Sequence, residues 1–453
     1  MVNTLANRKP TYDELLYMVQ ILVKRVEELE EEVRQLKQQK NSNNSSLPPS
    51  KDENRLPKNQ SLRSKSEKST GGQKGHKGKT LEMVNNPDEI IHHVPCQCEH
   101  CGNDLSEIQK VPQGRRQIVD IPPIYPKYTE HQVYSRQCTC GHINHGVFPT
   151  GVDNHIQYGP NVESLVAYLN VGQYLPYGRM QSMFNKLFNI PLSQGSIHNM
   201  LERFSRRVTP MYEQIKKEVA QSDMVGADET GVKVNGIKWW LWTWQNARNT
   251  FITASDNRAY QTIEQHFPDG FKKAHLVSDC YTAHLKTPAL AHQLCTSHLM
   301  RDLNYLIEMT RSPRAVRMKL LLMDALHLKR NIPDTEYDKA SDERSFIRKE
   351  LDRLLTSDMH GEHKKVKTFF KRLIKNKAHI IEFLYHAHVP PDNNGSERAI
   401  RNAKVKQKVS SQFKSKNGIA NYAKIRSVFD TCLKQGIDIF ETAQLAAALK
   451  PAE

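Results

Sequence analysis

The sequence predicts a multidomain α+β protein. Three features of the 453-residue chain lead to this prediction. A heptad pattern near the N-terminus predicts a coiled coil, and clustered cysteines further along predict a small zinc-binding domain. Acidic residues that follow strand and turn patterns predict an α/β core, with a helical region before it and an α-helical insertion within it.

Charge and composition limit what this protein does. The chain has 65 Lys and Arg residues against 49 Asp and Glu residues, which leaves a formal net charge of +16. Such a basic balance favours a polyanionic partner such as nucleic acid. No apolar run approaches the roughly 18 residues that a membrane span needs, and the N-terminus lacks the apolar core of a signal peptide. We therefore expect a soluble, cytoplasmic protein with no membrane partner.

Residues 11–40 carry the coiled-coil pattern. Their apolar positions alternate by four and three, with Val at a and Leu at d, which favours a parallel two-stranded coil. The predicted seam consists of Leu15, Val19, Leu22, Val26, Leu29, Val33 and Leu36. We expect a homodimer or a higher oligomer, and the alternative is an amphipathic helix that packs on its own domain.

A polar and basic segment follows at residues 41–85. Asn, Ser, Pro, Lys and Gly dominate it, for example in NSNNSSLPPS and STGGQKGHKGK. It has too few apolar residues to fold alone, so we predict a disordered basic linker. Its lysines would either follow a phosphate backbone or belong to a merely solvated tether.

Residues 86–150 contain a candidate zinc site. Two short cysteine knuckles flank strand-like segments at residues 115–122 and 128–138, and the expected ligands are Cys98, Cys101, Cys138 and Cys140. Four thiolates in two close pairs form a typical structural Zn²⁺ site. The second knuckle is one residue tighter than usual, so another residue could supply one ligand; these alternatives are Cys96, His100, His142 and His145. The remaining alternative is a set of reduced structural cysteines.

Residues 158–210 predict a helical region. Residues 177–187 and the segment SQGSIHNMLERFSRR are joined by a short turn, as in a helix-turn-helix, with Ser193 as the expected cap of the second helix. Polar residues of the second helix would enter a DNA groove, and they are Gln194, Ser196, His198 and Asn199. Helical pairs of this kind are also common in cores that bind no DNA.

Three acidic residues stand in distinctive settings: Asp228 in VGADETGVKVNG, Asp279 in LVSDCYTAH and Glu397 in DNNGSERAIRN. Each Asp ends an apolar strand pattern, and two strands that end at one sheet edge bring their carboxylates together. Glu397 follows the turn signal PPDNNGS and begins a helical segment, with Ser396 or Asn394 as the expected cap. Mg²⁺ prefers carboxylate oxygens, so this set predicts a two-metal site for phosphoryl transfer.

We therefore predict a catalytic domain over residues 220–430. The neighbouring Glu229 should point to the opposite side of its strand, so the metal is assigned to Asp228. A helical, lysine-rich insertion interrupts the domain at about residues 300–388, and a helical tail follows over residues 431–453. The alternative for each acid taken alone is a turn or cap residue.

Four motifs of this chain resemble those of the insertion sequence 66 (IS66) family of DDE transposases. They are GADETGVKVNG, SDCYTAH, CTSHLMR and DNNGSERAIRNAKVKQKVSSQFKS. The resemblance runs over nearly the whole chain, and it implies a leucine zipper, a zinc-binding domain and a ribonuclease H-like catalytic domain. It also implies a bacterial enzyme that cleaves double-stranded DNA at element ends and joins the strands to target DNA. Two catalytic Mg²⁺ ions, for which Mn²⁺ can substitute, a structural Zn²⁺ ion and accessory proteins of the same element complete the implied set.

Basic residues near the acidic set are candidates for phosphate or DNA contacts. They are His298, Arg301, Arg398, Arg401 and Lys404. Arg401 lies one helical turn after Glu397, so it would contact the scissile phosphate or pair with Glu397 itself. A lone C-x-x-H motif cannot complete a zinc site, which favours a structural or phosphate-contacting role for His298.

The predicted function is that of a DNA transposase. The residues alone support metal-dependent phosphodiester chemistry, and the cutting and joining of element ends comes from the resemblance. One alternative is a ribonuclease H-like nuclease without strand transfer. The other is a catalytically silent, zinc-containing DNA-binding regulator.

Overall fold

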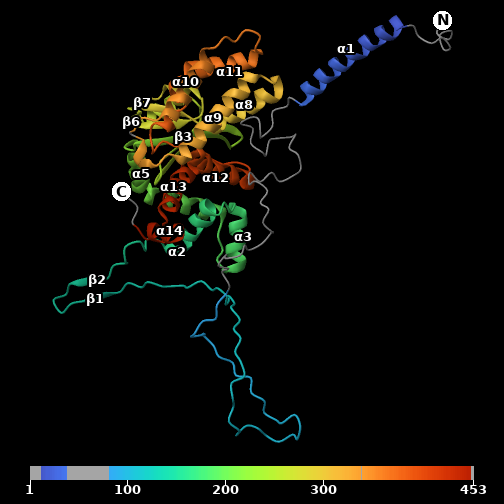
Figure 1. The fold of residues 1–453 in the computed structure, drawn as a ribbon. Coiled ribbons are helices and arrows are strands. Elements are labelled where there is room, and N and C mark those ends of the chain that lie inside the picture. The colour runs from blue at the N-terminus through green and yellow to red at the C-terminus, as the bar shows by residue number, and fades with distance from the viewer. Residues whose placement is uncertain (1–11, 38–80, 338, 450–453) are drawn as a thin grey trace, which may run out of the picture. The chain divides into compact units, whose positions relative to one another are not determined.

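A computed structural model describes residues 12–37, 81–337 and 339–449 of the chain (Figure 1). Contacts divide the chain into two compact units: Leu56–Tyr125, and Met1–Arg55 together with Pro126–Glu453. The described residues form fourteen α-helices, a five-stranded mixed sheet and a two-stranded sheet. This composition is consistent with the predicted α+β class. Within the described ranges, no helix is both long and apolar enough to cross a membrane.

The five-stranded sheet contains the strands that were predicted around the acidic residues. They are β3 (Met224–Val234), β4 (Ile237–Gln245), β5 (Thr250–Ser255), β6 (Phe271–Ser278) and β7 (Ala289–Leu294). The order is β5-β4-β3-β6-β7, in which β4 is antiparallel to β3 and β5, and β6 is parallel to β3 and β7. The short helices α6 (Tyr260–His266) and α7 (Thr282–Lys286) connect the strands. The expectation that a strand ends at Asp228 is wrong, because β3 pairs with β4 as far as Val234.

The helices that precede the sheet in the chain, and those that follow the insertion, share one hydrophobic core with the sheet. They are α2 (Pro160–Ala167), the π-helical turn η2 (Tyr168–Gly172), α3 (Tyr177–Leu187), α4 (Gln194–Arg207), α5 (Thr209–Ala220), α12 (Asn394–Ser410), α13 (Lys416–Gln435) and α14 (Ile439–Ala448). Phe204 of α4, Trp242 of β4 and Phe429 of α13 are fully buried in this core. Ser193 caps α4 as expected, through the N–H of Ser196. The predicted boundary at residue 430 falls inside α13, because that helix packs against β5 along the core.

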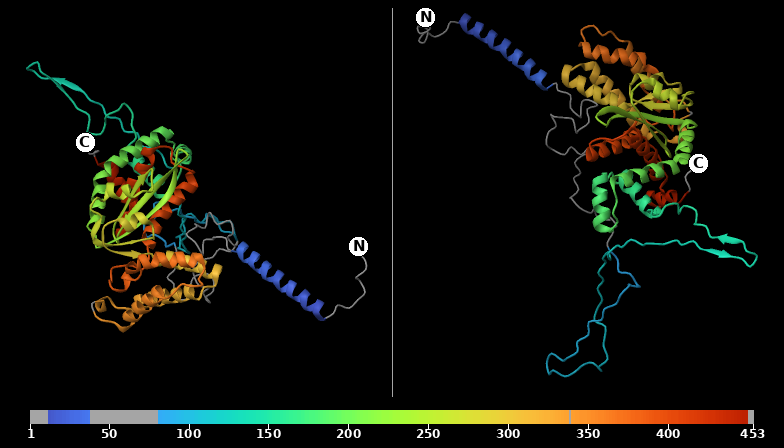
Figure 2. Two further views of the ribbon diagram at one scale, coloured as in Figure 1. Left: turned by 90° about the horizontal axis from the view of Figure 1, so that it is seen from above. Right: turned by 180° about the vertical axis from the view of Figure 1, so that it is seen from behind.

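A second hydrophobic core belongs to the helices between β7 and α12. They are α8 (Thr296–Thr310), α9 (Pro313–Asn331), α10 (Asp342–Thr356) and α11 (Lys364–Lys375), with the 3₁₀ turns η3 (Asp334–Glu336), η4 (Lys377–His379) and η5 (Glu382–Leu384). Their buried side chains, such as Leu303 and Phe370, pack on one another and on Val277 and Leu294 of the sheet. Figures 1 and 2 show α8 to α11 gathered away from α2, α3 and α14. These helices correspond to the predicted insertion.

Helix α1 (Tyr12–Lys37) lies within the residues predicted as a coiled coil. Five predicted seam side chains, from Leu15 to Leu29, are between 44% and 62% exposed. An apolar stripe of this exposure remains available for pairing with another helix. The helix is therefore confirmed, and its pairing stays a prediction.

The region predicted to bind zinc contains little regular structure. Strands β1 (Ser135–Gln137) and β2 (Ile143–His145) form an antiparallel pair, and an isolated bridge joins Gln97 to Asp104. The strand-like segment at residues 115–122 is not a strand. Ile118 within it is 94% exposed, and β-propensity stabilises a strand only where side chains pack against neighbours. Of the predicted linker, residues 41–80 lie outside the described part of the chain.

Candidate active site

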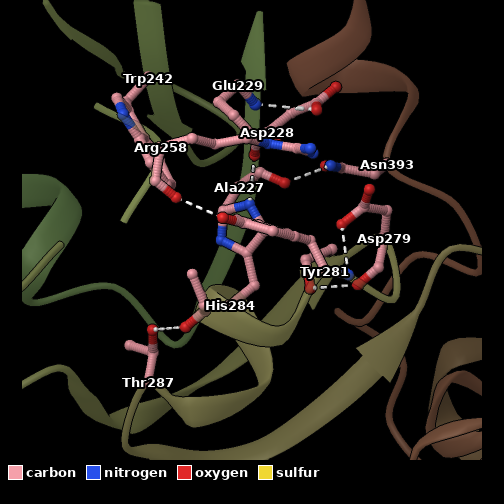
Figure 3. A network of polar contacts seen from close by, with 12 residues as sticks. Ala227, Asp228, Glu229, Trp242, Arg258, Asp279, Tyr281, His284, Thr287 and Asn393 are labelled. Atoms are coloured by element: carbon pink, nitrogen blue, oxygen red, sulfur yellow. Dashed lines mark hydrogen bonds and ion pairs between the residues drawn. The ribbon is translucent and has the colours of Figure 1, made fainter. Parts of the chain in front are cut away.

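The parallel pairing of β3 with β6 sets Asp228 level with Asp279. Gly226 is the partner of Val277 in this register, and both acids lie two residues further along their chains. Because side chains alternate along a strand, both acids share the side of the sheet taken by that pair. Asp279 follows the last residue of β6, and its carboxylate accepts a hydrogen bond from the N–H of Tyr281 at 2.8 Å (Figure 3). Two of the predicted metal ligands therefore meet at one place on the sheet.

The first turn of α12 brings Glu397 to the same place. Asn393, just before the helix, donates from Nδ2 to the carbonyl of Ala227 in β3 at 2.6 Å (Figure 3). Neither Asn394 nor Ser396 is the N-cap, because the helix begins at Asn394 and Asn393 occupies the cap position. The side chain of Asn393 makes no cap hydrogen bond, since it holds the helix start against β3.

Two glycines permit this close approach of α12 to the sheet. A Cβ atom on Gly226 of β3 would lie 2.7 Å from Oδ1 of Asn393 and 2.8 Å from Oγ of Ser396. One on Gly395 of α12 would lie 2.5 Å from Nε2 of Gln245 in β4. Neither site has room for a side chain, so the start of α12 lies at backbone distance from β3 and β4. The glycines beside the acids in VGAD and NNGSE are the sequence signal for this docking.

Glu229 points away from the other acids, towards Arg258 and His284. Its carboxylate accepts a hydrogen bond from Nε of Arg258 at 2.6 Å and lies 2.7 Å from Nε2 of His284 (Figure 3). Burial by itself would raise the pKa of Glu229, but the contacts with His284 and Arg258 outweigh burial and lower it. Glu229 is therefore a paired structural carboxylate.

Asp228 has the opposite environment, although it is the next residue in the chain. Burial raises the pKa of Asp228 well above its usual range, and the nearby carboxylates of Glu229, Asp279 and Glu397 add to this rise. Its carboxylate accepts the N–H of Glu229 at 2.8 Å, and no Lys or Arg among the described residues forms an ion pair with it. A carboxylate without an ion-pair partner of its own, close to two further carboxylates, fits a divalent ion such as Mg²⁺, which prefers oxygen donors.

Glu397 has basic neighbours on α8. Its Oε1 lies 3.2 Å from Nη2 of Arg301 and 3.7 Å from Nδ1 of His298. Burial, followed by the charge of Arg301, lowers the pKa of His298. Ligand atoms of Cys295, His298 and Glu397 lie within 4.8 Å of one another. The arginine that contacts Glu397 is thus Arg301, whereas Arg401 is exposed on α12.

The remaining basic candidates differ in their surroundings. Arg398 is exposed on α12, as is Arg401. Lys404 donates from Nζ to the carbonyl of Gly231 in β3 at 2.7 Å. Lys404 therefore helps to attach α12 to the sheet, while the two arginines face solvent.

Sequence reasoning did not identify the residues that hold Glu229. His284 belongs to the SDCYTAH motif, so the motif itself was a signal for it. Arg258 gave no signal, because it follows β5 in a segment with turn composition. The guanidinium of Arg258 lies 3.9 Å from the ring centre of Tyr281, and the hydroxyl of Tyr281 donates to the carbonyl of Arg258 (Figure 3).

The two predicted zinc knuckles are tight turns of similar form. Gly102 and Gly141 have φ angles of +71° and +90°, and each donates its N–H to the carbonyl of the first cysteine of its knuckle at 2.9 Å. The backbone N–H of the second cysteine lowers the pKa of Cys98 in one knuckle and of Cys138 in the other. All four cysteines are free thiols. N–H groups directed at sulfur favour the thiolate, which is the form that binds metal.

A mixed sheet that gathers three carboxylates in reach of solvent is typical of metal-dependent enzymes. The Transposase IS66 family matches residues 155–421, which is more than half of the sequence, and the chain belongs to this family. Residues 5–82 match a family of unknown function (DUF6444). A similar protein is the uncharacterized protein y4hP of Sinorhizobium fredii (strain NBRC 101917 / NGR234). It is 21% identical over 390 residues, which cover 78% of this chain and 70% of that protein.

Family membership confirms the resemblance found in the sequence motifs. It identifies the protein as a transposase. Transposases of this class are DNA-cleaving enzymes that bind DNA and use divalent metal. The matched range contains the whole five-stranded sheet, the helical insertion and α12.

Proposed function

We propose that the protein is the DNA transposase of an insertion sequence, with a DDE-type site at Asp228, Asp279 and Glu397. It cleaves DNA at the element ends with water and then uses the freed 3′-hydroxyl to attack target DNA. The observation that supports this proposal most is the environment of Asp228. This carboxylate faces two others without a cationic partner among the described residues, while the adjacent Glu229 is fully paired.

The three carboxylates would hold two Mg²⁺ ions, or Mn²⁺ in their place. Bound metal supplies a site that activates the attacking oxygen and stabilises the leaving one. Asp228 and Asp279 present their oxygens from the sheet, and Glu397 presents its oxygens from α12. Arg301 balances the charge of Glu397 and orients its carboxylate. The exposed Arg398 and Arg401, one and four residues after Glu397, would bind DNA phosphates.

The order of the strands supports a ribonuclease H-like catalytic core for this chemistry. Its neighbouring strands β3 and β6 are parallel; Asp228 lies in β3, and Asp279 directly follows β6. The helical insertion between β7 and α12 has a hydrophobic core of its own. An insertion of this kind would cover or clamp the DNA that reaches the site.

The parts that precede the catalytic core would bind DNA and pair the chains. Cys98, Cys101, Cys138 and Cys140 would hold a structural Zn²⁺ ion in a domain over residues 86–150. On α4, Gln194 and Asn199 are exposed and would enter a DNA groove. Helix α1 would form the leucine zipper of a dimer. Accessory proteins of the same element are further candidate partners.

The test is cleavage and joining of labelled element-end DNA in Mg²⁺, with DNA binding measured in parallel. Asp279→Asn removes one proposed metal ligand and changes the charge by one. Asp269→Asn is the matched control, because Asp269 is an exposed residue in the turn before β6. We expect wild type and Asp269→Asn to cut and join, and Asp279→Asn to bind DNA without reacting.

Other outcomes would select the alternatives. Cleavage without joined products, even with pre-cut ends, would favour a nuclease. Normal binding with no Mg²⁺-dependent cleavage by wild type would favour a silent DNA-binding regulator. An Asp279→Asn variant as active as wild type would exclude the proposed site.

A further inference from the structure

Three histidines and a glutamate gather apart from the three proposed catalytic carboxylates. His275 lies in β6, Glu382 lies in η5, and His386 and His388 lie in the segment that leads towards α12. The ligand atoms of His275, Glu382 and His386 all lie within 4.8 Å of one another. No step of the proposed DNA chemistry uses this group.

The spacing of His275, Glu382 and His386 fits one ion with three protein ligands. Nε2 of His386 lies 3.6 Å from Oε2 of Glu382, and Nε2 of His388 lies 3.2 Å from Nδ1 of His275. Two ligands on one Zn²⁺ ion with bonds of about 2.0–2.1 Å are roughly 3.3 Å apart. Imidazole nitrogens with one carboxylate are a usual donor set for zinc.

The protonation state of the group also suits a metal. His275 is only 3% exposed. Burial, followed by the charges of His386 and His388, lowers the pKa of His275 to about 4. Nδ1 of His275 faces Nε2 of His388 at 3.2 Å, and the neutral imidazole is the form that binds metal. Burial raises the pKa of Glu382, as expected of a carboxylate whose negative charge is incompletely balanced.

Hydrogen bonds to the backbone fix the positions of His275 and of the segment that contains His386. Lys329 of α9 donates from Nζ to the carbonyls of His386 and Ala387 at 2.9 and 3.0 Å. The N–H of His275 donates to the carbonyl of Asp223 at 2.8 Å. The imidazoles are thus positioned by backbone contacts. These contacts do not use the ring nitrogens, which face one another and can bind a ligand.

We propose that His275, Glu382 and His386, with His388 beside them, bind a structural Zn²⁺ ion. The ion ties β6, which carries Asp279 at its end, to the segment that leads into α12 and Glu397. It connects two elements that hold the proposed catalytic carboxylates and takes no part in the reaction at DNA.

The test counts zinc ions on the full-length chain after metal removal and reloading with Zn²⁺. His386→Ala removes a ligand at a half-buried position, and Glu382→Gln is a second variant with nearly unchanged shape. His379→Ala is the matched control, because His379 pairs its ring with His292 at 5.1 Å and no carboxylate completes a described group there. We expect both site variants to bind one Zn²⁺ ion fewer per chain than wild type and His379→Ala.

Co²⁺ in place of Zn²⁺ separates this site from the proposed cysteine site. Cysteine ligands give a thiolate-to-metal charge-transfer band, whereas nitrogen and oxygen ligands do not. We expect His386→Ala to keep the charge-transfer band and to lose only the weaker bands of nitrogen and oxygen ligands. The rise in Tm that Zn²⁺ gives to wild type should also shrink in the variant.

Equal zinc content in wild type, His386→Ala and Glu382→Gln would overturn the proposal, because the group would then be a hydrogen-bonded cluster only. Circular dichroism of the metal-free variants establishes that they are folded before ions are counted. No readout uses DNA, so a failure here would leave the proposed transposase activity untouched.

Discussion

At the scale of single residues, the contrast between Asp228 and Glu229 separates a structural acid from a candidate catalytic one. Both are acids on β3, but only Glu229 has basic side chains in contact with it, Arg258 and His284. Repulsion among the carboxylates around Asp228 therefore lowers the stability of the metal-free protein. Sites of this kind often trade stability for function.

Substitution of these two neighbours should have opposite effects on stability. In chelator, Asp228→Asn should stabilise the protein by roughly 1–2 kcal/mol, because it removes carboxylate repulsion. Glu229→Gln should destabilise it by about 2–4 kcal/mol, because Arg258 loses its counter-charge and the buried His284 loses a carboxylate partner. Urea unfolding of the two variants beside wild type measures both changes. Equal destabilisation by both would contradict the contrast drawn between the two acids.

Lys406 of α12 provides a pH-dependent prediction remote from the acids. It is buried and donates from Nζ to the carbonyl of Asn170 in η2 at 3.1 Å, and burial lowers its pKa to about 8. A lysine with a lowered pKa contributes full stability above its unfolded pKa of about 10.4, and this is lost as pH falls through the folded value. Lys406→Met should therefore be about 3 kcal/mol more stable than wild type at pH 7, because each pKa unit corresponds to about 1.4 kcal/mol.

That advantage of Lys406→Met should shrink as pH rises from 8 and vanish above about 10.4, since wild type then carries a neutral lysine. Lys408→Met is the control, because Lys408 is exposed on the same helix. Thermal unfolding at a series of pH values provides the measurement. A constant difference between Lys406→Met and wild type at all pH values would show that folding does not lower the pKa of Lys406.

At the scale of secondary-structure elements, the docking of α12 on β3 decides where Glu397 lies. Gly226→Ala would place a Cβ atom within 2.8 Å of Gln245, Asn393 and Ser396. The start of α12 must then shift, so we expect a loss of about 1–3 kcal/mol in stability and a larger loss of Mg²⁺-dependent DNA cleavage. Gly178→Ala in α3 is the control, because its nearest neighbour would be 3.7 Å away. Wild-type cleavage by Gly226→Ala would disprove this role of the docking.

The elements of the core were predictable because their signals are local. Short apolar runs that end in Asp predicted the strands around both aspartates, and the composition after PPDNNGS predicted α12. The end of β3 was predicted too early. Asp228 ends the apolar run in the sequence, but the hydrogen-bonded pairing of β3 with β4 continues beyond it to Val234. The partners of Glu229 could not be predicted, because Arg258 and His284 reach it only through the tertiary fold. Residues 115–122 have strand composition, but within the described part of the chain no strand pairs with them.

For the whole molecule, parts of the chain with separate hydrophobic cores contribute to one proposed DNA-cleaving site, and the chain is basic. The sheet core carries Asp228, and the insertion core ends at the segment that leads into Glu397. A net charge of +16 should make DNA binding fall steeply with salt concentration, since each neutralised phosphate releases counterions. Under the proposed function two element ends would be processed together, and a dimer with two sites would achieve this.

Helix α1 should supply that dimer. Leu22 is a predicted d position and is 62% exposed in the single chain, so its burial would require a partner helix. Leu22→Lys should weaken dimerisation by about 100-fold, because roughly 3 kcal/mol of apolar burial is lost over the two chains. Gln20→Lys adds the same charge outside the seam and should dimerise like wild type. Sedimentation equilibrium of the full-length proteins distinguishes them, and equal association of both variants would place the dimer interface elsewhere. If the seam is correct, Leu22→Lys should also lose products that join two element ends while still cutting single ends.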